Sequence, residues 1–144
     1  MISENFKVTG QVTIQKNGEV VRDIPNTVVT AGKNNIASLI TGAGSVMTHM
    51  AVGTGTTAVA AGDTALETAI AGSRVSLTST TVTSNAIEYV GDFPAGTGTG
   101  AVTEAGVFND SSAGTLLCRT VFSVVNKGAD DTLKITWTVT VSDS

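Results

Sequence analysis

The stretch MAVGTGTTAVAAGDTALETAIAGSRV (residues 50–75) has the glycine spacing of a loop that could bind a phosphate group. A phosphate-binding loop also needs a lysine followed by Ser or Thr at the start of a helix, because the lysine charge meets the outer phosphates. No lysine follows Gly53-Thr54-Gly55, and the next basic residue is Arg74. A dinucleotide fingerprint needs a third glycine where Ala58 stands, inside a parallel βαβ unit. We therefore predict turn glycines here, and no cofactor.

Few other residues could do chemistry, and none has a partner at a useful spacing. His49 is the single histidine, so a zinc site lacks ligands. Cys118 is the single cysteine, which excludes an intrachain disulfide, and its place in an apolar strand is typical of a core thiol. Asp110, Asp130 and Asp131 stand in polar turns and are too few for a calcium loop. We expect no metal site.

Glu104 is the one acidic residue that interrupts an apolar strand, AVTEAGVF. We expect it to face water or to form a structural pair with Arg74 or Arg119, rather than to act as a catalytic carboxylate. No serine has a recognisable nucleophile motif or a partner base. The sequence therefore predicts a protein that is not an enzyme.

Composition narrows the possible partners. The 144 residues suffice for one domain, and only 14% are charged, against about 25% in an average soluble domain. The net charge is −4 and the eight basic residues are scattered, whereas nucleic-acid binding requires clustered Lys and Arg. No basic amphipathic helix, membrane-length apolar run or secretory signal is present. We expect synthesis in a cytoplasm, with no nucleic acid or membrane as partner.

Alternating apolar residues predict a mainly β domain of residues 1–144. FKVTGQVTIQ places Phe6 and Val12 on one face, Asn17-Gly18 predicts a hairpin turn, and Pro25 is expected to end the second strand. The last strand alternates with period two, with Leu133, Ile135, Trp137, Val139 and Val141 on its apolar face. The spacing of these runs predicts an antiparallel β-sandwich or jelly-roll-like barrel of seven or eight strands.

Two short helices are expected near the start of this sheet. Residues 30–42 carry Ile36, Leu39 and Ile40 at helical spacing, with Gly42 as a stop. Thr64 and Glu67 have the spacing of a capping box, which predicts a second helix ending near Gly72.

Four segments together resemble small virion structural proteins of tailed bacteriophages. They are NTVVTAGKNNIASLITG, the glycine stretch above, YVGDFPAGTGTGAVTEAGVFND and TLLCRTVFSVVNKGADDTLKITWTVTV, which span about residues 26–141. The most specific element is AVGTG…DTAL…R followed about forty residues later by EAGVF. A related arrangement is found in the N-terminal modules of phage tail-collar fibres.

The resemblance implies either of two roles. A capsid decoration (cement) protein is a small β domain, often a trimer, that binds the major capsid protein lattice on the virion surface. A tail-fibre, collar or head-fibre module would normally continue into a shaft, and the chain stops at Ser144, so we expect decoration. Residues 1–6 could form an arm that docks on the capsid through Ile2 and Phe6, or simply a frayed end before an ordinary first strand.

A third hypothesis of a different class is a carbohydrate-binding β-sandwich. Such sites stack exposed aromatic rings on sugars, and Trp137 and Tyr89 are the candidates. This hypothesis depends on both rings being exposed.

Overall fold

The computed structural model describes residues 6–143 and has nine β-strands and one α-helix over that range. The strands are β1 (Phe6–Lys16), β2 (Glu19–Val28), β3 (His49–Gly53), β4 (Val75–Ser76), β5 (Ser79–Thr83), β6 (Ala86–Phe93), β7 (Gly100–Phe108), β8 (Leu116–Lys127) and β9 (Leu133–Asp143). The helix, α1 (Thr30–Ile40), lies between β2 and β3 in the chain. The prediction of a mainly β protein is confirmed.

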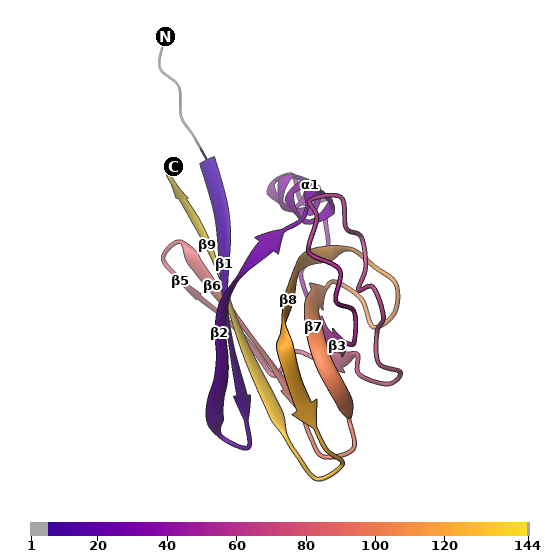
Figure 1. Ribbon diagram of the computed structural model, residues 1–144. Helices are drawn as coiled ribbons and strands as arrows, with labels where there is room; N and C mark the ends of the chain where they lie inside the picture. The colour runs from indigo at the N-terminus through magenta and orange to yellow at the C-terminus, as the bar shows by residue number, and fades with distance from the viewer. Residues whose placement is uncertain (1–5, 144) are drawn as a thin grey trace.

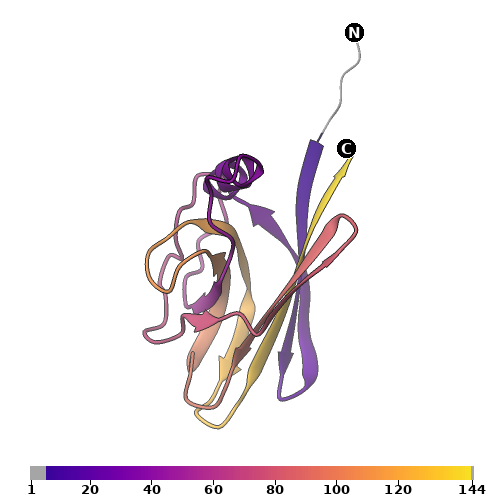
Figure 2. The same ribbon diagram turned by 180° about the vertical axis from the view of Figure 1, so that it is seen from behind.

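All nine strands belong to one antiparallel sheet in the order β4-β3-β7-β8-β2-β1-β9-β6-β5. The sheet curls, so that β3, β7 and β8 form one side and β1, β9 and β6 the other, as the two opposite views in Figures 1 and 2 show. We expected a β-sandwich or jelly-roll-like barrel of seven or eight strands, and the described residues form one continuous curled antiparallel sheet of nine.

Strand β2 makes this continuity possible. It pairs with β1 from Glu19 to Asn26 and then with β8 through Thr27 and Val28. The prediction that Pro25 ends the strand is wrong, because the strand passes through the proline as it crosses between the two sides. The Asn26 side chain lies over Gly10, where a Cβ atom would stand 1.6 Å from the Asn26 oxygen.

The segment predicted as one strand, SRVSLTSTTVTS, divides into β4 and β5. These two strands are the opposite edges of the sheet, although only Leu77 and Thr78 separate them in the chain. The Leu77 N–H donates to the Thr48 carbonyl and the Thr78 N–H to the Val90 carbonyl, so this short link bridges the two sides. The curled sheet therefore approaches closure at its edges.

The core lies inside the curl. Four of the five predicted apolar residues of β9, from Leu133 to Val139, are at most 2% exposed, and Trp137 is the largest fully buried side chain. From β1, Val12 and Ile14 are also fully buried. The alternation in both strands is confirmed, and so is the hairpin at Asn17-Gly18.

Helix α1 covers one end of the curl (Figure 1). Its contact with β8 depends on Gly32, where a Cβ atom would stand 2.3 Å from the Leu117 carbonyl oxygen. Ile36 packs against the core as predicted. Ile40 does not, because the helix ends there and leaves the side chain 82% exposed.

The second predicted helix is absent from the structure, where residues 64–72 are irregular. Glu67 does not close a capping box. Its carboxylate accepts the N–H groups of Thr56 and Thr57, and the backbone N–H groups of Glu67 and Thr68 donate to Glu104. Because so short a helix is costly to nucleate, these tertiary hydrogen bonds decide the conformation.

Candidate functional site

Glu104 is the centre of the most connected polar cluster in the described chain. It lies on β7, is fully buried, and accepts four hydrogen bonds. Oε2 accepts the N–H groups of Gly55 (2.8 Å) and Thr68 (2.7 Å), while Oε1 accepts the Glu67 N–H (2.9 Å) and Arg119 Nε (2.9 Å). Three backbone N–H groups and the positively charged Arg119 side chain therefore satisfy the carboxylate, as a buried anion requires.

Arg119 completes the cluster from the neighbouring strand β8. It is 2% exposed and paired with Glu104, which confirms one of the two partners that the sequence suggested. Its NH1 donates to Asp63 Oδ2 at 2.9 Å and its NH2 to the Thr57 carbonyl at 3.2 Å. Every group that Arg119 contacts in this way is a carboxylate or carbonyl of the protein, so the cation is neutralised internally.

The glycine stretch closes over this pair. A Cβ at Gly55 would stand 2.4 Å from Glu104 Oε2, and one at Gly53 would stand 2.4 Å from the Thr68 carbonyl oxygen. The glycines therefore permit a close approach of the loop to Glu104. We predicted turn glycines from the sequence and did not foresee that N–H groups of this loop donate to a carboxylate of the protein itself, that of Glu104.

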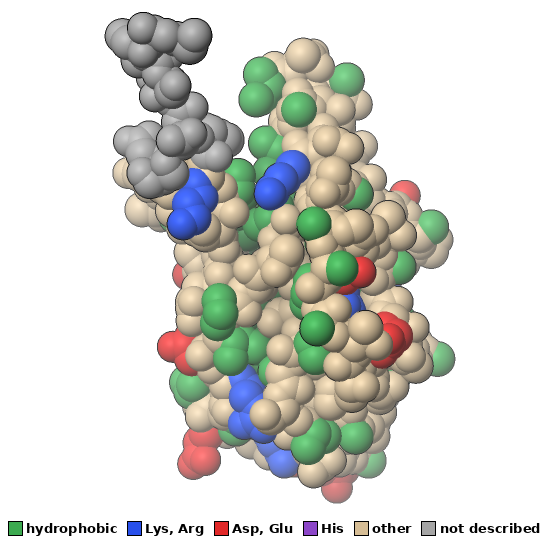
Figure 3. Space-filling model, turned by 45° about the horizontal axis from the view of Figure 1, so that its top comes forward, with side chains coloured by type: hydrophobic (Ala, Val, Ile, Leu, Met, Phe, Trp, Pro, Cys, Tyr) green, Lys and Arg blue, Asp and Glu red, His purple; other side chains and the backbone are tan. Residues whose placement is uncertain are grey.

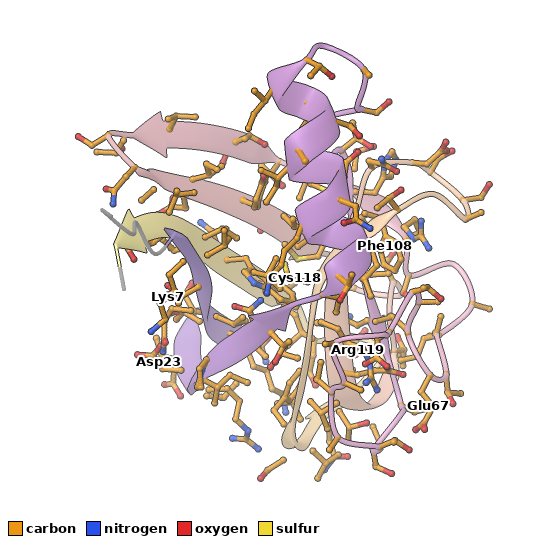
Figure 4. All side chains as sticks on the ribbon, turned by 90° about the horizontal axis from the view of Figure 1, so that it is seen from above. Lys7, Asp23, Glu67, Phe108, Cys118 and Arg119 are labelled. Atoms are coloured by element: carbon orange, nitrogen blue, oxygen red, sulfur yellow. The ribbon has the colours of Figure 1, made fainter. Side chains whose placement is uncertain are left out.

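Residues 54–74 form a long loop held to the sheet by this cluster, which we call the Glu104 cluster (Glu104, Arg119, Asp63 and Glu67). Hydrogen bonding by the Thr57 side chain, and then by the N–H groups of Thr57 and Thr56, lowers the pKa of Glu67. Figure 4 shows Arg119 and Glu67 on the same side of the molecule, beneath and within this loop. The arrangement fixes the loop backbone against the sheet.

The remaining reactive side chains are also engaged. Burial raises the pKa of the Cys118 thiol well above its usual value, which confirms a core cysteine rather than a nucleophile. His49 is half-buried, with Nδ1 at 2.7 Å from the Thr48 hydroxyl and Nε2 at 3.4 Å from that of Ser76. Arg74, the other suggested partner of Glu104, instead lies 3.6 Å from the centre of the Phe108 ring.

Asp110 and Asp131 accept hydrogen bonds that stabilise turns. Asp110 accepts the Ser112 N–H, and Asp131 accepts the Gly128 N–H and an Asn17 amide hydrogen. These hydrogen bonds lower the pKa of both carboxyl groups. Within residues 6–143 no three His, Cys, Asp or Glu side chains come together in a way that could hold a metal ion.

A different kind of surface lies at the end of the molecule that carries α1. A groove of about 430 Å³ runs between α1 and the inner face of β5, β6 and β9. Its walls contain no charged side chain, and they are formed by Asn35, Ile36, Leu39, Val46, Met47, Thr80, Val82, Ile87, Tyr89, Leu117, Val139 and Val141. The groove is therefore suited to apolar side chains.

Exposed apolar residues lie in the groove wall and at the nearby end of α1. Val46 and Val82, both in the wall, are 64% and 68% exposed, and Ile40, outside the wall at the last residue of α1, is 82% exposed; we call Ile40 and Val46 the helix-end patch. Figure 3 shows hydrophobic side chains at this end, with few charged ones among them. A second hollow, between α1 and β1, is lined by Ile36, Ala37 and Ile40 together with Val8, Lys7 and Lys33.

The predicted interface residues cannot be placed on this surface. Ile2 lies outside the described residues, and Phe6 is described only by its backbone, which begins β1 opposite Asp143. The residues that sequence reasoning missed are Ile40, Val46 and Val82. The sequence could have indicated that Ile40 is exposed. Gly42 ends the helix just beyond it, so no further helical turn follows to cover its side chain.

The aromatic rings named for sugar binding are both buried. Trp137 is fully buried and Tyr89 is 8% exposed. Among residues 7–142, no Phe, Tyr or Trp side chain exceeds that exposure. The carbohydrate hypothesis therefore lacks the stacking platform on which it depended.

No helix in residues 6–143 is long and apolar enough to cross a membrane. The chain matches no protein-family model, no curated protein and no solved structure.

Proposed function

We propose that this chain is a non-enzymatic structural protein of a tailed-bacteriophage virion, and that it decorates the capsid by binding the major capsid protein. The observation that carries the proposal is the contrast between a satisfied polar cluster and an open apolar end. Ile40, Val82 and Val46 are the three most exposed large apolar side chains in the described residues, and Val46 and Val82 line the groove. Exposed apolar groups rimming a groove are typical of a protein–protein contact.

The charge distribution supports a protein partner. The groove beside α1 has no charged lining residue, and the hollow between α1 and β1 adds only Lys7 and Lys33. Two lysines at the rim of an apolar surface suit a partner with an apolar ridge and a nearby carboxylate. They are too few for the phosphate contacts of a nucleic-acid site.

The fold suits a role that repeats over a lattice. The nine-stranded sheet, with the loop that the Glu104 cluster holds against it, is a platform that can be repeated. Weak contacts made by many copies add up through multivalency. The sequence resemblance supplies the rest of the proposal: a homo-oligomer, for which the resemblance implies a trimer, on the outer capsid surface after synthesis in the host cytoplasm. We also propose that the curled sheet is a variant of the β-sandwich or jelly-roll-like barrel that the sequence predicted.

The test is sedimentation of the purified protein with empty capsids of its phage. We expect stoichiometric co-sedimentation that saturates at a fixed number of copies per capsid. Isolated tails serve as the comparison particle, because binding to tails without binding to capsids would favour the fibre or collar role. Failure to bind either particle would contradict a virion role.

A further inference from the structure

Strand β5 is an unprotected edge of the sheet. It pairs with β6 on one side only, and each of its five residues is exposed. Its free side therefore presents unpaired backbone N–H and C=O groups to solvent. Water can hydrogen-bond to these groups, and another extended strand can replace that water along the whole edge.

Natural sheets normally guard such an edge with a charge, a proline or a bulge, or by keeping the strand short. The sequence of β5, Ser-Thr-Thr-Val-Thr, has no charge and no proline, and its pairing with β6 runs without a bulge. The opposite edge, β4, is protected by its length of two residues. An unguarded neutral edge of β-branched residues is the surface that strand pairing requires.

We propose that β5 pairs antiparallel with β5 of a second copy of this chain. The register that centres Thr81 on the two-fold axis places Ser79 opposite Thr83 of the second copy, and Thr80 opposite its Val82. No like charges meet along the axis, because the strand carries none. Cross-strand pairs of β-branched residues stabilise a sheet, and two-fold symmetry makes every such contact twice.

The apolar groove adds to this contact. Thr80 and Val82 are the β5 residues that face the groove, and Val82 is 68% exposed at its rim. In the paired arrangement the two grooves lie side by side across the axis, and each Val82 is covered by the strand of the other copy. The partner is therefore a second copy because this strand is complementary to itself in shape, hydrogen bonding and charge.

This inference is independent of the capsid role and differs from the trimer that the resemblance implies. A two-fold contact gives a dimer, of twice the 14.5 kDa of one chain. The helix-end patch stays outside the paired strands, so dimerisation and capsid binding can be measured separately.

The experiment is sedimentation equilibrium of the purified chain over a range of concentrations. We expect a concentration-dependent dimer. Val82→Lys places like charges near the axis and should weaken dimerisation at least about 10-fold. The matched control is Val20→Lys, also at an exposed valine on a strand (59% exposed), which should dimerise like the wild type.

A second variant separates pairing from a general effect of charge. Thr80→Glu combined with Val82→Lys puts opposite charges directly across the two strands, so dimerisation should return to within about 3-fold of the wild type. Recovery supports the proposed register. A monomer at all concentrations, a trimer, or equal dimerisation by Val82→Lys and wild type would each overturn the inference.

Discussion

Two regions of this molecule treat polar groups in opposite ways. Around Glu104, charged and polar atoms are buried and each carboxylate oxygen accepts two hydrogen bonds. At the C-terminal end of α1, Ile40 and Val46 stand in solvent, and Val46 lines a groove whose walls have no charged side chain. Glu104 and Arg119, which are charged and could do chemistry, thus hold a loop against the sheet. The exposed apolar surface at the end of α1 is made of aliphatic residues that could do none.

The difference shows how a buried ion pair can be structural. A buried charge is costly unless it is paired and hydrogen-bonded, and Glu104 meets both conditions by drawing in the backbone of residues 54–74. The loop would otherwise expose its own N–H groups. At the C-terminal end of α1, by contrast, the helix stops at Ile40 and leaves this apolar side chain uncovered.

The largest effect should come from breaking the Glu104 cluster. Glu104→Ala leaves Arg119 without its closest buried partner and three loop N–H groups without an acceptor, so we expect a loss of at least about 3–5 kcal/mol in the free energy of unfolding. Urea denaturation measures this loss. Glu88→Ala, at an exposed glutamate on β6, is the control and should change stability little.

A smaller loss should follow from adding one methyl group to the loop. Gly55→Ala brings a Cβ within 2.4 Å of Glu104 Oε2 and should cost about 1–3 kcal/mol as the loop shifts. Gly62→Ala in the same loop meets no atom within 4 Å, and its stability should stay near that of the wild type. Equal melting temperatures for the two variants would show that the close approach at Gly55 is not tight.

The smallest effect at neutral pH concerns Tyr89 in the groove wall. Burial raises the pKa of its hydroxyl to about 12, because the phenolate is disfavoured away from water. The unfolded chain therefore loses this proton first, near pH 10, so stability that is complete below pH 10 should fall between pH 10 and about 12. Tyr89 is the only tyrosine, so absorbance at alkaline pH reports it directly.

The control for this titration is Tyr89→Phe. It should be as stable as the wild type at neutral pH and should lose less stability above pH 10. An ionisation at the ordinary tyrosine pKa would mean that the groove wall is open to water.

Local patterns predicted the strands because their period of two survives in the fold. The alternation of β9 and the Asn17-Gly18 turn are local signals, and both are confirmed. The single curled sheet could not be predicted, since it depends on β2 changing partners after Asn26. The split of residues 73–84 into two opposite edges has no local signal either.

The candidate site was predicted in one part and missed in another. An acidic residue inside an apolar strand either faces water or is paired, which suggested Arg74 and Arg119 as possible partners of Glu104, and the structure pairs it with Arg119. The capping box at Thr64 misled because Glu67 and Thr68 donate their N–H groups to Glu104, a residue 36 or more positions away. The helix-end patch was missed because helical spacing alone placed Ile40 with the core.

The measurement that tests the account most directly is a titration of fluorescently labelled protein onto empty capsids, comparing Ile40→Lys with Val20→Lys. Both variants replace an exposed apolar residue, and a lysine at the end of α1 is favourable to the helix, so folding should be unchanged. We predict that Val20→Lys binds like the wild type and that Ile40→Lys binds at least about 10-fold more weakly. Equal binding by the two variants would contradict recognition through the α1 end.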